Sequence, residues 1–582
     1  MSYSLGIDFG TSTTRVAICE NGELPISIPI GPGGTSDFIH SIASYEIVSG
    51  DIKLSTVGQE VSYRDDAPFM VVKEVKRCLW AHEDPNVTVN NAWWNSDTKN
   101  FTLLDSTTQA QTEISPERVV KDIIEEALFL AVEAINRNKI ARGIDELSIK
   151  KLPLRLGTAV VAGMKVREIM AGVAREIGFT DIKIVDIIEE PVLAGMSYFN
   201  TAQVEPGENV LVYDFGGGTF DVAIIRVEDG SPTQWTLLAA DGEQSLGGTD
   251  IDRELRRYVI GLLAKEEGMD IAEYEQYLDE GDIYELDRAV NGAKERLSRE
   301  ENTDILLTHF LGERIELKLS RSQLEKVVLD SKLLDRTFEC TLRAFRRAWA
   351  LSQSDSEFYV GDGSTSPSVD AALALRDNDL ADFIDKIIVV GGSTRMPLIN
   401  QQIRKLWGEN VVVSGEIIDP ITATALGAAG GISSIGSIVD RLPFRITIND
   451  ETAGSDIVLY EAYAPTSVHR TLRIDRGITP KKFPFDVSSG SRLQICLFDP
   501  DGGLISKDRV DTGMIGPHSL EVDYFGQILL KRDAKIVQKI NNPAQHQDQK
   551  DFLTRIQENE EQRRKGYKDP GLVNVRRKPG EV

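Results

Sequence analysis

The sequence predicts an α/β protein in which a glycine-containing hairpin occurs twice, followed by a small all-β unit and a polar tail. Residues 5–18 and 211–225 each read as an apolar strand, an aspartate, a glycine turn and a second apolar strand. Residues 387–397 read as a buried-type strand that runs into a Gly-Gly turn. After residue 437 the apolar runs become short and are separated by glycine and proline, which is typical of an all-β unit.

The second hairpin, Leu211–Ile225, makes the clearest prediction of a site. Its first strand ends at Asp214, three glycines follow, and the second strand starts after Thr219. Because glycine has no side chain to obstruct a ligand, the backbone N–H groups of such a tip can bind phosphate oxygens. Asp214 and Asp221 bracket the tip, where carboxylates can hold a hydrated Mg²⁺ or orient a water. The alternative is an ordinary glycine-rich hairpin without a ligand.

The first hairpin, Leu5–Ile18, repeats this device with Asp8, Gly10 and a run of hydroxyl residues. Two such hairpins and a late Gly-Gly-Ser match the actin and sugar-kinase ATPase fold, in which two similar α/β lobes clamp a nucleotide between paired phosphate loops. This resemblance implies an actin-like, two-lobed ATPase domain with duplicated mixed-sheet subdomains.

Length, charge and cysteine use limit the class of protein. A chain of 582 residues is too long for one compact core, so several domains are expected. The net charge of −26 argues against non-specific nucleic-acid binding. Four widely spaced cysteines favour a reduced, cytoplasmic setting over a metal site. We find no signal peptide and no apolar run near the roughly 20 residues that a membrane span needs. We therefore expect a cytoplasmic protein without nucleic-acid or membrane partners.

Apolar spacing predicts the elements between these motifs. Residues 114–137 should form a helix, because the Ser-Pro-Glu sequence at Ser115 is a favourable N-terminal signal and apolar residues recur at helical spacing. Residues 71–80 read as a short helix or a strand edge, and 352–368 as an insertion or loop. The other expected strands are 41–48, 53–57, 157–162, 183–188, 235–240, 315–319 and 383–390, and the other expected helices are 165–177, 192–199, 250–267, 282–298 and 320–350.

Taken together, these residues resemble the seventy-kilodalton heat-shock chaperone family (the DnaK-like ATPases) more closely than actin or a sugar kinase. The resemblance runs from about Tyr3 to Gly436. It rests on six linked motifs, which are Gly6–Ser12, Val75–Arg77, Ile188–Pro191, Asp214–Asp221, Leu246–Asp250 and Gly391–Pro397.

The resemblance implies a site for ATP or ADP with Mg²⁺. Lys76 would stabilise negative charge that develops on the γ-phosphate and the attacking water, and Glu190 would orient the metal-bound water. Taken alone, Lys76 reads better as a solvated surface lysine, and only its place in the linked motifs favours the catalytic role. Lys294 reads equally as part of an exposed helix face. The implied catalytic residues are Lys76, Glu190, Asp214, Thr219 and Asp221, the implied metal-binding residues are Asp8 and Asp214, and the implied nucleotide-binding residues are Gly10, Thr11, Ser12, Gly216, Gly217, Gly218, Thr219, Lys294, Ser298, Gly391, Gly392, Ser393 and Arg395.

The chain departs from the family pattern at several motifs. Residues 291–295 lack the acid and the arginine of the family's adenosine helix, and 419–422 lack an adenine-side carboxylate, so adenine affinity should be weaker. Residues 159–163 replace the proline motif that relays nucleotide state, although Arg167 keeps the partner arginine. Residues 437–440 are a short substitute for the acidic, leucine-rich linker.

The predicted domains are an actin-like ATPase domain at residues 1–437, a small β domain at 441–530 that binds a substrate or partner, and a disordered charged tail at 531–582. The β unit contains Asp475–Lys482, which is weakly similar to a strand turn of the family's substrate domain. Only 52 residues follow Leu530, too few and too polar for the family's helical lid. The resemblance therefore implies a divergent, lidless member.

The predicted function is a chaperone-like ATPase that binds and slowly hydrolyses ATP and couples nucleotide state to client or partner binding by the β domain. Its partners would be polypeptide clients, with a J-domain co-chaperone or a nucleotide exchange factor. The alternative is a nucleotide-dependent, actin-like assembly or scaffold protein with one dedicated partner. A sugar kinase ranks lower, because no separate sugar-site aspartate is evident. The client, the pathway and the oligomeric state are not encoded in any motif that we recognise.

Overall fold

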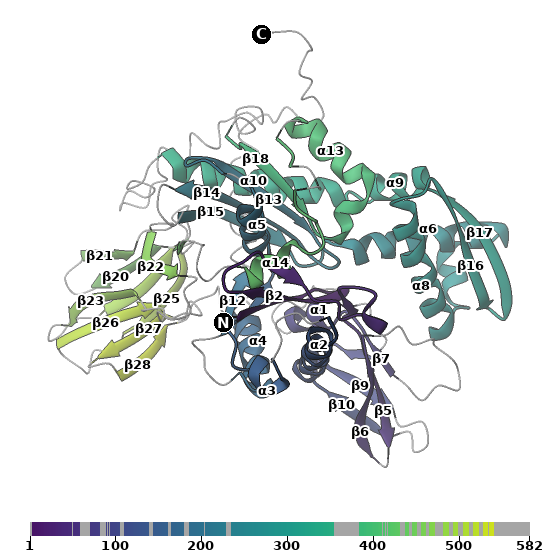
Figure 1. Cartoon of the computed structure of the whole chain (residues 1–582), viewed down its shortest axis with the longest axis horizontal. Helices are drawn as coiled ribbons and strands as arrows, with labels where there is room; N and C mark the ends of the chain where they lie inside the picture. The colour runs from purple at the N-terminus through teal and green to yellow at the C-terminus, as the bar shows by residue number, and fades with distance from the viewer. Residues whose placement is uncertain are drawn as a thin grey trace, which may run out of the picture.

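The computed structural model describes most of the chain as a mixed α/β structure with several sheets (Figure 1). The described residues are 3–48, 50–58, 70–81, 89, 91, 93–104, 110–138, 144–160, 164–179, 185–202, 204–228, 234–353, 383–409, 411–413, 415, 417–430, 437–441, 445–450, 455–460, 465–471, 481–487, 493–498, 504–510, 516–522, 528–532 and 535–540. Parts of several sequence predictions lie outside them, among them 161–163 of the relay motif, 183–184 of a strand, 354–368 of the insertion, 475–480 of the strand turn and the tail after 540.

The first large sheet contains the N-terminal hairpin. Strands β1 (Tyr3–Phe9) and β2 (Thr13–Glu20) pair antiparallel, and β11 (Leu154–Thr158) lies parallel to β1 on the other side. The order of the sheet is β12-β11-β1-β2-β3, and β4 also pairs with β2. Its remaining strands are β3 (Ile26–Ser27), β4 (Ile39–His40) and β12 (Val185–Glu189).

Helix α2 (Pro116–Asn138) covers one face of this sheet and confirms the helix predicted there. Arg118 N donates to the Ser115 hydroxyl at 3.3 Å, so the expected N-terminal signal is present. The apolar stripe of α2 is buried in one core with alternate residues of β1, such as Leu5 and Ile7. Further helices on this part are α1 (Val75–Ala81), α3 (Glu146–Ile149) and α4 (Met164–Ile177).

Two three-stranded sheets extend the first part, in the orders β6-β5-β7 and β10-β9-β8. Residues 71–80, predicted as a short helix or a strand edge, contain parts of both, because α1 begins three residues after the end of β7. The strands are β5 (Ala43–Val48), β6 (Asp51–Val57), β7 (Met70–Val72), β8 (Trp94–Asn95), β9 (Asn100–Leu104) and β10 (Gln111–Ile114).

The second large sheet repeats the arrangement of the first. Strands β13 (Asn209–Phe215) and β14 (Phe220–Glu228) pair antiparallel, and β18 (Lys386–Val390) lies parallel to β13. Every residue of β13 is buried, because helix α10 (Leu333–Gln353) and helix α5 (Glu190–Thr201) contribute to the apolar cores on the sheet. The sheet continues through β15 (Gln234–Glu243).

A helical part follows β15 and adds the hairpin of β16 and β17. The predicted single helix at 320–350 is wrong, because two helices meet at Lys332, whose φ of 62° interrupts the helical backbone. The elements of this part are α6 (Gly248–Glu266), α7 (Ile271–Glu275), α8 (Glu280–Leu297), β16 (Asn302–Phe310), β17 (Glu313–Ser320), α9 (Arg321–Asp330) and, after β18, α13 (Pro397–Trp407).

Helices α5 and α14 (Ala423–Ala429) connect the two large sheets through close backbone packing. A Cβ on Gly427 would lie 1.7 Å from the Leu193 carbonyl oxygen, and one on Gly6 would lie 2.2 Å from the Ala429 amide nitrogen. Glycine is therefore required at both contacts, where helix α14 packs directly against α5 and β1.

The C-terminal β unit consists of two four-stranded sheets, β21-β20-β24-β25 and β23-β26-β27-β28. One apolar core joins them and includes Ile446, Ile495 and Leu520. The strands are β20 (Arg445–Asp450), β21 (Ser455–Tyr460), β23 (Lys481–Val487), β24 (Leu493–Phe498), β25 (Leu504–Arg509), β26 (Gly516–Val522), β27 (Ile528–Arg532) and β28 (Lys535–Ile540).

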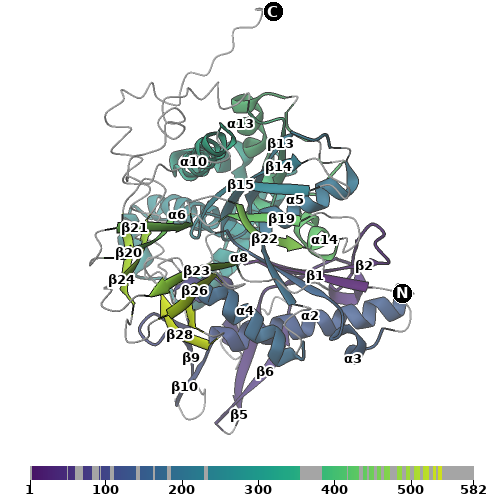
Figure 2. The same ribbon diagram turned by 90° about the vertical axis from the view of Figure 1, so that its left-hand side faces the viewer.

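Two features differ from the predicted organisation. The disordered tail expected from residue 531 is wrong at its start, because β28 pairs antiparallel with β27 and Ile540 joins the apolar core. The residues predicted as a short linker, 437–440, lie in strand β19 (Ser437–Arg441), which pairs parallel with β15 in the second large sheet. Strand β22 (Pro465–Thr471) pairs antiparallel with β19, so the three strands lie side by side (Figure 2).

Candidate functional site

The tips of the two hairpins contact each other. In each tip a glycine N–H donates to a threonine carbonyl at 3.0 Å, from Gly10 to Thr13 and from Gly216 to Thr219. A Cβ on Gly217 would lie 2.5 Å from the Ser12 hydroxyl oxygen, and one on Gly218 would lie 2.2 Å from that of Thr11. The structure thus brings together the predicted residues Gly10, Thr11, Ser12, Gly216, Gly217, Gly218 and Thr219, and we call this place the hairpin junction.

Two glycine turns support the second tip from behind. Gly248 N donates to Gly216 O at 3.0 Å, and the Ser393 hydroxyl donates to the same carbonyl at 2.7 Å. Gly391 has a φ of 90°, and a Cβ there would lie 2.6 Å from a carboxylate oxygen of Asp214. The predicted Gly391, Gly392 and Ser393 turn therefore lies directly against the second hairpin.

Lys76 and Glu190 form a buried ion pair beside the junction. Lys76 lies in α1 of the first part, and Glu190 is the first residue of α5. Burial alone would lower the pKa of Lys76, but the carboxylates of Glu190 and Asp8 raise it above its ordinary value. The ammonium is therefore charged at neutral pH and held next to the aspartates.

Three aspartates carry unfavourable negative charge at the junction. Burial, together with the neighbouring Glu190 carboxylate, raises the pKa of Asp8 to about 6 and that of Asp221 to about 7. The pKa of Asp214 is raised well above its ordinary value, first by burial and then by Glu190 and Asp221. A cation bound here would relieve this repulsion, so the cluster suits a divalent metal.

The chemistry of this donor set fits Mg²⁺ held mainly through water. Mg²⁺ binds oxygen ligands, dehydrates reluctantly and is commonly held by one or two carboxylates plus substrate phosphates. Within the part of the chain that the structure describes, no three His, Cys, Asp or Glu side chains are arranged to ligate one ion directly. The residues that could hold such an ion are Asp8 and Asp214, the two predicted metal-binding residues.

Arg77 links the two parts of the site and was not among the predicted site residues. Its guanidinium is fully buried and donates to Gly218 O at 2.9 Å and to Asp250 at 2.5 and 3.3 Å. Asp250 also accepts from Gly247 N at 2.7 Å, at the N-terminus of α6. Arg77 therefore ties α1 to both the second tip and the turn behind it. The sequence feature that could have identified Arg77 is its position directly after Lys76 in the motif Val75–Arg77.

Of the residues predicted for the adenosine side, Lys294 lies near the junction and is already hydrogen-bonded there. Lys294 donates to Gly248 O at 3.0 Å and to Asp252 at 2.8 Å. The Ser298 hydroxyl donates to Lys294 O at 3.1 Å within its own helix turn. Arg395 is half exposed and lies 3.8 Å from Asp419. Lys294 and Ser393 both lie next to Gly248, so these two side chains are near each other. Among the described residues, no contact between Ser298 and the hairpin tips is evident.

Arg15 lies opposite Asp8 near the first hairpin tip and was not among the predicted site residues. It pairs with Asp8 in the β1–β2 register and is 6% exposed. The signal was an arginine inside an otherwise apolar strand, immediately after the hydroxyl residues of the first hairpin.

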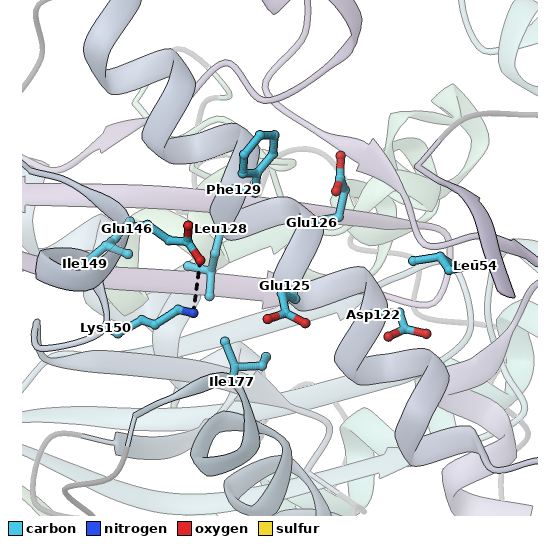
Figure 3. A pocket seen from close by; sticks show the side chains of 10 residues that line it. All are labelled: Leu54, Asp122, Glu125, Glu126, Leu128, Phe129, Glu146, Ile149, Lys150 and Ile177. Carbon is cyan, nitrogen blue, oxygen red and sulfur yellow. Dashed lines mark hydrogen bonds and ion pairs between the residues drawn. The ribbon is translucent and has the colours of Figure 1, made fainter.

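A separate hollow of about 250 Å³ lies at helix α2, away from the predicted residues (Figure 3). Its wall includes the carboxylates of Glu125 and Glu126, and an ion pair of 3.2 Å between Lys150 and Glu146. Acidic walls do not suit a phosphate ligand, so the hollow is not a second candidate for a nucleotide site.

Among the described helices, none has the length and apolar character to cross a membrane. All four cysteines are buried free thiols.

Comparison with known proteins identifies relatives of the chain. A family model described as Hsp70 protein matches residues 174–374 and 365–436, which include the second hairpin and the Gly391 turn. The chain is also similar to the chaperone protein DnaK of Burkholderia cenocepacia (strain HI2424) and of Burkholderia orbicola (strain MC0-3), with 32% identity over 250 residues in each case. This similarity covers 42% of the chain and 32% of each relative, so the chain matches about a third of the length of these curated relatives.

Proposed function

We propose that the chain is a divergent member of the heat shock protein 70 family and a Mg²⁺-dependent, chaperone-like ATPase, which the family-model match and the similarity to DnaK support. Its nucleotide state would control the binding of a polypeptide client or a dedicated partner by the β unit. The observation that carries the proposal is the contact of the two glycine tips beside the buried Lys76–Glu190 pair. An actin-like arrangement of the two large sheets, with the nucleotide between the hairpins, is part of the proposal.

Each group at the junction has a role in this reaction. The N–H groups of Gly217 and Gly218 and the Thr219 hydroxyl would bind phosphate oxygens, because the glycines have no side chain of their own in the way. When bound, Mg²⁺ supplies positive charge that offsets the charge of the phosphates. Asp8 and Asp214 would hold that ion, and Asp221 would orient water near it.

Lys76 would act mainly in the transition state. A preorganised charge stabilises negative charge that develops during phosphoryl transfer, at no cost of reorganisation. Glu190 keeps the ammonium in place through the buried ion pair, and burial protects this electrostatic effect from screening by solvent. The buried pair therefore supports a role of Lys76 in the rate of ATP hydrolysis more than in the binding of the nucleotide.

The coupling part of the proposal is supported by strand β19. It adds to β15, which pairs with β14, and β14 begins directly after the second glycine tip. Strand β22 then pairs with β19. Because β22 comes between β21 and β23 in the chain, backbone pairing connects the hairpin to a segment next to the β unit. A nucleotide that shifts β14 would alter this edge, provided that ATP and ADP bind the two arrangements differently.

The ATPase proposal is tested by ATP turnover of the full chain with Mg²⁺ and with excess EDTA. Turnover should be slow, should require Mg²⁺ and should be lost in Asp214→Asn, which keeps the shape of the side chain but removes its charge. If the wild-type chain binds neither ATP nor ADP at millimolar concentration, the proposed function is wrong.

Hydrogen exchange with ATP and with ADP tests the coupling. Peptides covering 437–441 and the β unit should differ in protection between the two nucleotides, and the chain should suppress aggregation of an unfolded client. Identical exchange, together with one saturable partner or nucleotide-dependent polymerisation, would instead favour a scaffold of actin-like type.

A further inference from the structure

Arg15 is a buried cation at the first hairpin tip whose place follows from the register of β1 and β2. Asp8 pairs with Arg15 and Gly6 pairs with Ala17, so all four residues share one face of the sheet. At Gly6 and Ala17 this face is covered by helix α14. The next pair on this face, Asp8 and Arg15, is closer to the hairpin tip than the residues that helix α14 covers.

The contacts of the guanidinium leave part of its hydrogen-bonding capacity unused. One Nη donates to the Thr13 hydroxyl at 2.6 Å, and the Phe38 ring centroid lies 5.1 Å from the guanidinium carbon. The Nε atom is buried without a hydrogen-bond partner, and its distance of 4.0 Å from Asp37 is too long for a hydrogen bond. A buried, unsatisfied N–H group is costly, which indicates a missing acceptor.

The surrounding charges place Arg15 between the two ends of the proposed nucleotide site. Its electrostatic neighbours are Asp8, at the phosphate end, and Asp419 and Arg395, at the adenosine end, in addition to Asp37. A ligand that extends from the hairpin tips to Arg395 therefore passes within electrostatic range of the guanidinium.

Arg15 also differs from the other cations near the junction. Lys76 is bonded to Glu190, Arg77 to Asp250 and Lys294 to Asp252. Arg15 is held instead by a hydroxyl group, a ring face and a more distant carboxylate. Because its planar fork matches phosphate oxygens, it is the best suited of these described cations to bind an anion.

We propose that Arg15 binds the phosphate groups of ATP and ADP, so that the first hairpin contributes a positive charge as well as backbone N–H groups. This inference rests on the proposed function. It also gives the chain a binding contact on the phosphates, where the adenosine-side motifs are incomplete.

Competition binding of ADP, pyrophosphate and adenosine tests the proposal in the presence of EDTA. Arg15→Met should weaken ADP and pyrophosphate by about tenfold or more, the scale of a charge-assisted hydrogen bond, and change adenosine by less than about twofold. The affinities of Arg15→Lys for ADP and pyrophosphate should lie between those of the wild type and Arg15→Met, because lysine keeps the charge but lacks the planar guanidinium. Arg314→Met, at an exposed position in β17, removes the same charge and should change nothing.

Thermal unfolding of the nucleotide-free variants separates binding from a structural role. If Arg15 only neutralises Asp8 and Asp37, Arg15→Met will unfold at lower temperature and bind ADP as the wild type does, which overturns the proposal. If Arg15→Met does not fold, Arg15→Lys decides, because unchanged ADP affinity in that variant also overturns it. A wild-type chain that binds no nucleotide refutes the proposed function itself, whereas normal wild-type binding with unaffected variants refutes only the role of Arg15.

Discussion

In the first hairpin Asp8 faces Arg15 across β1 and β2, and in the second Asp214 faces Asp221 across β13 and β14. The two tips close with the same hydrogen bond from glycine to threonine, and each first strand has a parallel neighbour, β11 or β18. The backbone is therefore repeated while the charge opposite the aspartate is reversed.

Under the proposed function, this difference would give the two hairpins different contacts with the ligand. Glycine and strand register build the tip, whereas the facing side chain decides which ion the tip attracts. The second hairpin presents two carboxylates with raised pKa values and suits a metal cation. The first presents one carboxylate with Arg15, and Lys76 stands close enough to lower the pKa of Asp8. It suits phosphate.

The largest expected effect separates Lys76 from Arg15. Lys76→Ala should lower single-turnover ATP hydrolysis by roughly 10²–10³-fold, because a preorganised charge is lost from the transition state. ADP affinity should change by less than about threefold, in contrast to Arg15→Met. A Lys76→Ala variant that hydrolyses ATP at the wild-type rate, or that loses ADP binding instead, would show that the two cations do not divide rate and affinity between them.

Asp8→Asn and Asp214→Asn compare equivalent positions in the two hairpins. Each should lower Mg²⁺-dependent hydrolysis by roughly 10²-fold, because a carboxylate that holds the ion is lost. Neither should lower the unfolding temperature of the nucleotide-free protein, because each removes a charge that burial already disfavours. The checks are hydrolysis rates over a Mg²⁺ titration and thermal unfolding in EDTA. Unchanged turnover in both variants would exclude these aspartates as the metal-holding groups.

The pH dependence of stability should show the charge of the cluster. The pKa of Asp8 is raised from 3.8 to about 6 and that of Asp221 from 3.8 to about 7, so the native state binds more protons than the unfolded state in this range. In EDTA, the free energy of unfolding should therefore fall by about 2 kcal/mol or more as pH rises from 4 to 7. Urea unfolding at several pH values measures this.

The control for the pH series is Asp221→Asn, which should flatten the upper half of the curve. Mg²⁺ with ADP should also reduce the slope, because a bound cation takes the place of the protons. A wild-type stability that rises over this pH range would contradict the raised pKa values.

The smallest effect concerns the contact between the hairpins. Gly218→Ala places a Cβ 2.2 Å from the Thr11 hydroxyl oxygen, whereas Gly392→Ala would meet nothing within 4 Å. Gly218→Ala should cost about 1–2 kcal/mol of stability, as overpacking does, and Gly392→Ala should cost less. Equal unfolding midpoints in urea for the two variants would mean that the tips are not in tight contact.

The sequence alone was sufficient for the local parts of the molecule. Alternating apolar strands around Asp-Gly motifs predicted both hairpins, and a Ser-Pro-Glu start predicted α2, because these signals act over a few residues. The sequence did not predict that the 320–350 helix is split at Lys332. The break comes from the positive φ of this one lysine, and no glycine or proline marks it in the sequence. Strand β28 escaped as well, because its lysines and glutamine hid the short apolar alternation.

Only the tertiary structure decided which charges meet. The sequence determined that Asp8, Lys76, Glu190 and Asp214 belong to recognisable motifs, but the Lys76–Glu190 pair joins residues 114 positions apart. The contact of Arg77 with Gly218 and Asp250, and the addition of β19 to β15, likewise depend on how separate elements pack. Motifs identify residues by their neighbours in the chain, whereas electrostatic roles depend on distance in space, which strand register and helix packing set.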